Sequence, residues 1–481
     1  MMDRRQVDVA IIGAGTAGLT AYNAARKHTD KLVLIEGGSY GTTCARVGCM
    51  PSKLLIAAAE QAHNAAQSGL FGIEIKHLVI DGRSVLRRVR NERDIFVASV
   101  LKSMTDIPDA HKLRGTARFL APGVLAVDDE IEITAARIVI ATGSSPHIPN
   151  RFQGLGNRLL TTDSLFELAD LPKRIAVFGG GAVGLELGQA LSRLGVDVSL
   201  FGHGGAVAGI ADPQIREYAR KCFNQAFFFD ADTNVTAISA DADQVSVSFS
   251  HPVKGAVTES FDYLLLATGR SPNLASLKLQ NSGLKLNEKG VPLTDPSTLQ
   301  CDNQPVFLVG DANQQRPVLH EAAHEGRIAG DNAGRYPALI NAERYVPFSV
   351  VFTSPQIARI GTLPCQLPAA ERENYVEASS CFEDQGRSKV IAKNQGILKV
   401  YARRDSGVFT AAEMFGPAAE HIGHLLAWAA QQQMTVSAML AMPFYHPVIE
   451  EGVRTALKDL QNHLDKAGAV VNPCLECGPG T

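Results

Sequence analysis

The chain has 481 residues, of which 45% are hydrophobic and 20% are charged, and its formal net charge at pH 7 is −3. This length predicts about three domains of ~100–200 residues each, and the nearly balanced charge argues against nucleic acid or a membrane surface as a partner. No apolar run approaches the ~20 residues that span a bilayer, and the N-terminal residues have no signal-peptide pattern, so we expect a cytoplasmic protein.

The first element, residues 7–12, is a β-branched apolar run that predicts a buried strand, and GAGTAG and a helical apolar spacing follow it at once. Glycines in such a unit permit a tight turn, the approach of backbone to a pyrophosphate, and the packing of helix on strand. Here they are Gly13, Gly15 and Gly18. The next strand ends on Glu36, whose carboxylate can bind ribose hydroxyls. These residues predict a dinucleotide-binding unit.

The same pattern recurs from residue 174, where the strand RIAVF leads into a second glycine turn, a helix and the strand VDVSLF. The glycines of this turn are Gly179, Gly181 and Gly184. Gly202 stands where an acid would be expected at the end of the second strand. Because an acid there favours NAD by repelling a 2′-phosphate, its absence predicts slack discrimination between NAD and NADP, which Gly202→Glu should sharpen.

Two similar segments, ATGS around Gly143 and ATGRSPN around Gly269, bracket the second unit as if it were inserted into the first. We therefore expect an α/β fold with two Rossmann-like dinucleotide-binding domains, the first formed by residues 1–150 and 271–346 and the second by residues 151–270. Residues 347–465 predict a C-terminal α+β domain. Residues 466–481 predict a mobile tail, which carries Cys474 and Cys477.

A pair of cysteines, Cys44 and Cys49, lies in the glycine-flanked segment GTTCARVGCMPSK. Three explanations are open: half of a zinc site, a structural disulfide, or a redox-active dithiol. No second pair lies nearby to complete four zinc ligands, and structural disulfides are rare in a reducing compartment. A redox pair beside a flavin fits best, because a flavin can pass two electrons between a nicotinamide and sulfur.

The chain closely resembles the class I pyridine nucleotide-disulfide oxidoreductases from residue 7 to about residue 464, and its motifs follow one another in the order typical of that family. The resemblance rests on GAGTAG with Glu36, TTCARVGCMPSK, ATGS, GGGAVGLE, ATGRSPN, VFLVGDAN and HPVIEE. It implies a flavoprotein enzyme with FAD in the first unit and NAD, or NADP, in the second. It also implies a homodimer joined through residues 347–465.

Carried over to this sequence, the resemblance implies that Cys44 is the thiol that meets substrate and Cys49 the thiol against the flavin. Lys53 and Glu186 would pair near the flavin and nicotinamide rings. Asp311 would bind the ribityl chain of FAD, Gly143 would lie near FAD, and Gly269 would lie in the NAD site.

His446 and Glu451, in HPVIEE, match the family's catalytic dyad, which acts on the disulfide of the partner subunit. From the residues alone, a surface histidine before a helix is the better explanation of His446. A base is nonetheless needed, because a substrate thiol with a pKa of about 8.5 attacks as the thiolate.

Among family members, the resemblance is nearest to those that oxidise dihydrolipoamide to lipoamide with NAD+, which would make a lipoyl domain of a 2-oxoacid dehydrogenase or glycine-cleavage complex the partner. FYHPV differs from their usual HAHPT, so an NAD(P)H-dependent reductase of another disulfide, similar to glutathione, thioredoxin or mercuric reductases, stays open. A metal-binding flavoprotein that uses the terminal cysteines is the alternative from a different class.

We assign no catalytic or metal-binding role to the remaining histidine and cysteine candidates. His421 and His424 could share a helix face, but their apolar surroundings favour packing over a metal site. The single cysteines are interpreted as ordinary core or surface residues: Cys222, Cys301, Cys365 and Cys381.

Overall fold

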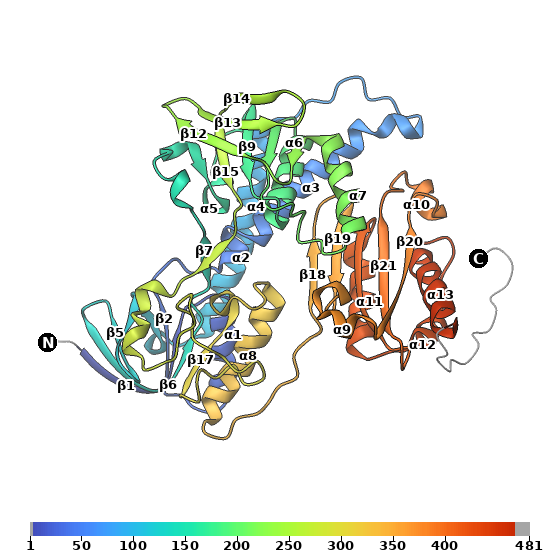
Figure 1. Cartoon of the computed structure of the whole chain (residues 1–481). Helices are drawn as coiled ribbons and strands as arrows, with labels where there is room; N and C mark the ends of the chain where they lie inside the picture. Colours follow the sequence, from blue (N-terminus) through green and yellow to red (C-terminus); the bar gives the residue numbers. More distant parts are fainter. Residues whose placement is uncertain (1–2, 467–481) are drawn as a thin grey trace.

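The computed structural model describes residues 3–466, and the terminal cysteine pair predicted to lie in a mobile tail falls outside them. Figure 1 shows three parts: a lower region around β1, an upper region around β9, and a C-terminal region on the right. Among the described residues, none of the helices is both long and apolar enough to cross a membrane.

The first sheet is mainly parallel and has the order β3-β2-β1-β6, with β17 also on β6 and an antiparallel hairpin, β5-β4, beyond. Its strands are β1 (Asp3–Ile12), β2 (Leu32–Glu36), β3 (Lys112–Arg114), β4 (Ala117–Ala121), β5 (Val124–Val127), β6 (Ile131–Ile140) and β17 (Val306–Leu308). β1 begins four residues before the predicted strand, because residues 3–6 pair with residues 131–134 of β6.

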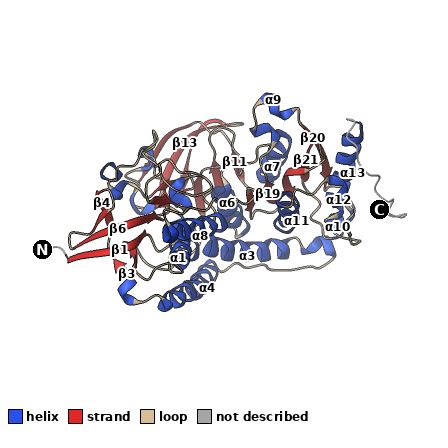
Figure 2. Cartoon of the chain, turned by 90° about the horizontal axis from the view of Figure 1, so that it is seen from below, coloured by secondary structure: helices blue, strands red, loops and turns tan. Residues whose placement is uncertain are grey.

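The helices of this region pack closely through small residues. They are α1 (Thr16–Ala25), α2 (Thr43–Arg46), α3 (Cys49–Ala66), α4 (Gly82–Ser103) and α8 (Leu319–Arg335). A Cβ at Gly326 or Gly330 of α8 would lie 2.2 Å from a backbone oxygen of α1, so glycine lets the two helix backbones meet. The long helices α3 and α4 lie side by side (Figure 2).

The second sheet is wholly parallel, in the order β11-β10-β9-β15-β8. Its strands are β8 (Leu159–Leu160), β9 (Arg174–Phe178), β10 (Asp197–Phe201), β11 (Phe228–Asp230) and β15 (Tyr263–Leu266). An antiparallel sheet adjoins it, made of β12 (Val235–Ala240), β13 (Val245–His251) and β14 (Gly255–Phe261). Its helices are α5 (Thr162–Leu165), α6 (Ala182–Arg193) and α7 (Pro213–Ala226).

Two short strands connect the first region with the second: β7 (Ser144–Pro146) and β16 (Arg270–Pro272). They pair with each other in antiparallel orientation. In Figure 1, β7 runs between the lower and upper parts. The chain therefore leaves the first unit just after Gly143 and returns just after Gly269.

The C-terminal region is one antiparallel sheet, ordered β18-β19-β22-β21-β20, with helices against it. Its strands are β18 (Phe348–Val351), β19 (Gln356–Ile360), β20 (Tyr375–Cys381), β21 (Ile397–Arg403) and β22 (Phe409–Gly416). Its helices are α9 (Ala369–Arg372), α10 (Gly386–Val390), α11 (Ala419–Gln431), α12 (Val436–Leu440) and α13 (Glu451–Lys466). The predicted fold class, two Rossmann-like units followed by an α+β domain, is confirmed.

Helix α11 keeps an apolar face that this chain does not bury, since Leu425 is 49% and Trp428 65% exposed. Of the two histidines predicted to pack here, His424 does contact the ring of Phe348, at 4.8 Å between centroids. His421 and His424 are both exposed, so the predicted packing is wrong for His421 and holds for His424 only through this ring contact. No group of three or more His, Cys, Asp or Glu side chains within residues 3–466 could hold a metal ion.

Candidate active site

The two cysteines of the GTTCARVGCMPSK segment lie on successive helices, Cys44 in α2 and Cys49 as the first residue of α3. Thr42 caps α2 by accepting a hydrogen bond from Ala45 N–H at 3.2 Å. A Cβ at Gly48 would lie 3.0 Å from the Thr43 oxygen and 3.2 Å from Cys44 Cα. Glycine at this position therefore allows the two helix ends to approach, which brings the thiols into hydrogen-bonding contact.

The two thiols, both free, differ in acidity. A hydrogen bond from the Cys44 thiol lowers the pKa of Cys49 to about 7, with the Lys53 charge assisting and burial opposing. The same hydrogen bond, together with burial, raises the pKa of Cys44 above its usual range. The start of α3 also favours an anion at Cys49. Near pH 7 the pair is therefore partly ionised, and its negative charge lies on Cys49.

Lys53, one turn along α3 from Cys49, joins three regions of the molecule. Its Nζ donates to Glu186 Oε2 of α6 at 2.7 Å and lies 4.6 Å from the Phe352 ring centroid. Glu186 is 6% exposed and its Oε1 accepts from Phe352 N–H, after β18, at 2.8 Å. The pairing expected of Lys53 and Glu186 is thus present, and it is placed where the three regions meet.

The first glycine turn has the geometry that a bound pyrophosphate requires. Gly13 has a φ of +108°, and a Cβ at Gly18 would lie 1.8 Å from the Gly13 oxygen, so both positions need glycine. A Cβ at Gly15 would meet nothing within 4 Å, which leaves open space beside the start of α1. At the end of β2, Glu36 Oε2 accepts from Ala14 N–H at 2.7 Å. The residues present fit FAD.

Asp311 lies in the 3-10 turn Gly310–Asn313. It is held by Ser144, which is held in turn by Arg270, and the sequence predicted neither role. Ser144 Oγ donates to Asp311 Oδ2 at 2.7 Å, and Arg270 Nε donates to Ser144 Oγ at 2.8 Å. Both belong to motifs that were recognised, ATGS and ATGRSPN, but their pairing joins β7 to β16 and has no local signal. Gly143 and Gly269, the residues before these strands, have φ of +66° and +106°.

The second glycine turn repeats the first. Gly179 has a φ of +121°, a Cβ at Gly184 would lie 1.9 Å from the Gly179 oxygen, and a Cβ at Gly181 would meet nothing within 4 Å. Gly202 is the equivalent of Glu36, because Gly179 N–H donates to the Phe201 oxygen as Gly13 N–H donates to the Ile35 oxygen. A Cβ at Gly202 would lie 2.5 Å from the Ala231 oxygen. A side chain at Gly202 would therefore force this backbone to shift, so Gly202→Glu is a poor test of coenzyme discrimination, which stays a prediction.

His446 and Glu451 form the expected dyad. His446 Nδ1 lies 2.9 Å from Glu451 Oε1, and Val448 N–H donates to Glu451 Oε2 at 3.1 Å. Burial opposes ionisation of Glu451, but these two hydrogen bonds outweigh it and lower its pKa. With Nδ1–H directed at the carboxylate, Nε2 is left to accept a proton, and the histidine side chain is 67% exposed.

The dyad and the cysteines are not brought together within one chain. In Figure 1, α12 and α13, which flank His446, lie at the far right, whereas α2 lies at the centre of the molecule. An arrangement in which the dyad serves a second subunit agrees with this separation.

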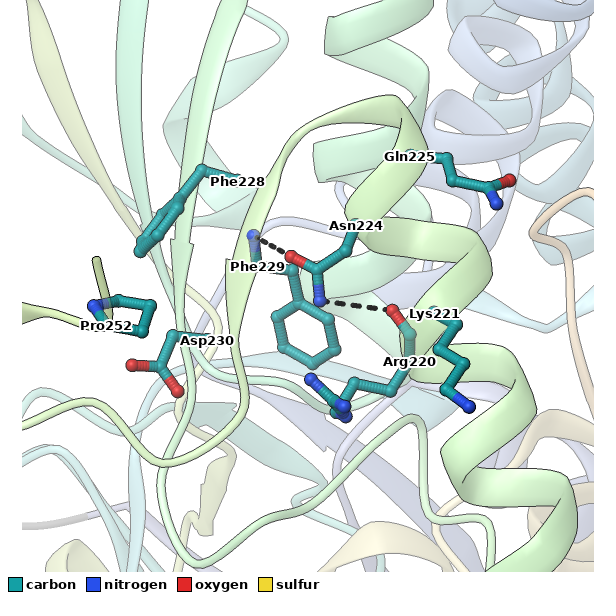
Figure 3. A pocket seen from close by; sticks show the side chains of 8 residues that line it. All are labelled: Arg220, Lys221, Asn224, Gln225, Phe228, Phe229, Asp230 and Pro252. Carbon is teal, nitrogen blue, oxygen red and sulfur yellow. Dashed lines mark hydrogen bonds between the residues drawn. The ribbon is translucent and has the colours of Figure 1, made fainter.

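A cavity of about 490 Å³ lies away from these residues, beside α7 and β11 (Figure 3). Two of its polar side chains are already paired: Arg220 binds Glu217, while Asn224 accepts from Phe229 N–H and donates to the Arg220 oxygen. It contains none of the predicted site residues.

Comparison with known proteins agrees with this geometry. Residues 7–326 match the family described as pyridine nucleotide-disulphide oxidoreductase, and residues 347–457 match its dimerisation domain. The chain is 28% identical over 461 residues to dihydrolipoyl dehydrogenase of Geobacillus stearothermophilus, covering 93% of this chain and 94% of that protein. It is 30% identical over 457 residues to mercuric reductase of Streptomyces lividans, covering 92% and 93%.

Two solved structures share the fold. The HOCl-induced flavoprotein disulfide reductase RclA of Escherichia coli superposes with a TM-score of 0.78 at 22% identity, covering 95% of this chain and 99% of that one. LpdA of Mycobacterium tuberculosis gives a TM-score of 0.80 at 22% identity, covering 95% and 100%. The chain therefore belongs to the class I pyridine nucleotide-disulphide oxidoreductase family, whose members are flavoenzymes that use FAD and NAD(P).

Proposed function

We propose that the protein is a homodimeric dihydrolipoamide dehydrogenase that oxidises dihydrolipoamide to lipoamide with NAD+ as the electron acceptor. The observation that carries the proposal is the cysteine pair: Cys44 and Cys49 lie on successive helices that Gly48 lets approach, and the pKa of Cys49 is lowered while that of Cys44 is raised. In vivo the dithiol would be carried on a lipoyl domain.

The reaction starts from a Cys44–Cys49 disulfide. His446 of one subunit takes a proton from a substrate thiol, and Glu451 orients its ring. The thiolate attacks Cys44 Sγ, the disulfide breaks, and Cys49 leaves as a thiolate, which its low pKa favours. The second substrate thiol, deprotonated in turn, attacks the substrate sulfur bound to Cys44, which releases lipoamide and leaves both cysteines reduced.

Reoxidation of the pair needs a two-electron acceptor, and FAD supplies that chemistry between sulfur and a pyridine nucleotide. We assign FAD to the first glycine turn with Glu36 and Asp311, and NAD(P) to the second turn. The Lys53–Glu186 pair stands between the two sites and places a positive charge one helical turn from Cys49, which keeps its thiolate stable.

The test is turnover of dihydrolipoamide with NAD+, compared with NADH- or NADPH-driven reduction of lipoamide, glutathione disulfide, oxidised thioredoxin and Hg(II). We expect the dihydrolipoamide reaction to be fastest and to be lost in Cys44→Ser and in Cys49→Ser. Cys381→Ser is the matched control, since Cys381 is exposed on β20 away from the site. Faster turnover of another acceptor would overturn the substrate assignment.

A second candidate, reduction of a different disulfide with NAD(P)H, has one observation in its favour. Tyr445, 79% exposed beside the dyad, puts a large ring where the pattern HAHPT of the dihydrolipoamide-oxidising relatives has alanine. Tyr445→Ala therefore separates the candidates: it should raise dihydrolipoamide turnover only if Tyr445 selects against that substrate.

A further inference from the structure

The loop that follows β10, residues 202–212, is packed onto the second glycine turn. Ala208 N–H donates to the Gly180 oxygen at 2.7 Å. A Cβ at Gly180 would lie 2.5 Å from the Ala206 oxygen, so the loop and the turn are in direct backbone contact. The position of the glycine turn therefore depends on where this loop is held.

The far end of the loop is held by the C-terminal sheet. Glu413 of β22 accepts from Ala211 N–H at 3.0 Å through Oε1 and from Asp212 N–H at 2.7 Å through Oε2. Arg359 of β19 donates to the Gly209 oxygen at 2.6 Å. Together with Lys399 of β21, which donates to Asp212 Oδ2 at 2.8 Å, these side chains form what we call the loop anchor: Arg359, Lys399 and Glu413.

The two carboxylates at the centre of this contact, Glu413 and Asp212, are buried and hydrogen-bonded. Glu413 is 0% exposed and Asp212 6%, and Asp212 Oδ1 also caps α7 by accepting from Gln214 and Ile215 N–H. Burial raises the pKa of Glu413, and the two N–H groups, with Arg359, act in the opposite direction. Loss of Glu413 would leave two loop N–H groups without their acceptor.

In the first unit, the glycine turn is held by a residue of the same unit. There, Glu36 binds Ala14 N–H of the glycine turn and Gly38 N–H of its own loop. In the second unit the equivalent position is Gly202, where no side chain fits, and the turn is instead fixed through the loop and its anchor.

We propose that Glu413 is a positioning residue for the pyridine nucleotide: it fixes, from the C-terminal domain, the loop that sets the glycine turn 179–181. The inference rests on the proposed assignment of NAD(P) to this turn. Glu413 itself touches the loop, and its effect reaches the nucleotide through Ala208 and Gly180.

The test is Glu413→Gln, which keeps the shape but turns one acceptor into an amide donor facing a backbone N–H. We expect NADH to bind about tenfold more weakly and its KM to rise about tenfold, which is the effect of one mispaired buried hydrogen bond. The kcat at saturating NADH, the FAD content and the anaerobic reduction of the cysteine pair by dihydrolipoamide should stay near wild type. A general loss of folding would instead lower all of these together.

Glu377→Gln is the matched control, because Glu377 is exposed on β20 of the same sheet and makes none of the bonds to the loop described above. If Glu413→Gln does not yield a flavoprotein, Arg359→Met is tested in the same way. It removes the bond to Gly209 and the 3.8 Å ion pair with Glu413 but keeps both acceptors of Glu413, so a smaller rise in KM for NADH is expected. NADH affinity within twofold of wild type in the folded variant overturns the inference. A wild-type protein that binds no pyridine nucleotide would instead overturn the proposed function.

Discussion

Substitution of Gly181 by alanine separates folding from coenzyme binding. Gly181 has φ −77° and ψ −177°, a conformation open to any residue, and its Cβ would meet nothing within 4 Å. Alanine there should stabilise the fold by ~0.4–1 kcal/mol, because it restricts the unfolded chain. The added methyl would nevertheless lie where the backbone must approach the pyrophosphate. We expect NADH to bind about 10- to 100-fold more weakly, a loss of ~1.4–2.7 kcal/mol.

Two neighbouring variants supply the contrast. Gly184→Ala would place Cβ 1.9 Å from the Gly179 oxygen, so it should destabilise the fold by at least the ~1–3 kcal/mol typical of overpacking. Gly15→Ala has the same open surroundings in the first unit and should weaken FAD instead of NADH.

The assay for these variants combines thermal unfolding with fluorescence titration of NADH and measurement of FAD content. Wild-type NADH affinity in a normally folded Gly181→Ala would refute the placement of the coenzyme at this turn. A Gly184→Ala as stable as the wild type would refute the packing argument.

The remaining predictions concern the cysteines and the dyad. His446→Ala should cut dithiol turnover by about 10²–10⁴, the range for losing a general base, with FAD retained; wild-type turnover would remove His446 from the mechanism. Mixing inactive Cys49→Ser and His446→Ala chains should restore about a quarter of wild-type activity, because half of the random dimers would contain one complete site; no recovery after verified exchange would contradict a site shared between subunits. In the reduced protein, alkylation of Cys49 should rise through pH about 7 as its thiolate forms. Lys53→Met should move this midpoint upward, since a charge that favours the thiolate is lost, and a downward move would reverse the electrostatic argument.

The glycine turns could be predicted from the sequence because their requirements are local. Gly13 needs a positive φ and Gly18 needs contact with Gly13, and both constraints act within six residues of chain. The cysteine turn is similar, since Gly48 directly permits the approach of Cys44. Such patterns hold wherever the segment lies in the fold.

Features that depend on distant residues could not be predicted from local patterns, and the Lys53–Glu186 pair was expected only from the family resemblance. The polar start of β1 is a strand only because the first half of β6 pairs with it. Ser144 is 167 residues from Asp311, and Glu413 is about 200 residues from the loop that it holds. Gly202 showed the converse: the missing acid was visible in the sequence, but the Ala231 backbone that excludes it was not.

The central claim is that Cys44 and Cys49 cycle between a disulfide and two thiols. Mass spectrometry after alkylation, before and after anaerobic addition of NADH, tests it directly on the peptide that contains residues 41–53. The account predicts no alkylation of this pair in the air-oxidised protein and alkylation of both cysteines after NADH. Two alkylated cysteines in both samples, or a disulfide that NADH leaves intact, would contradict it.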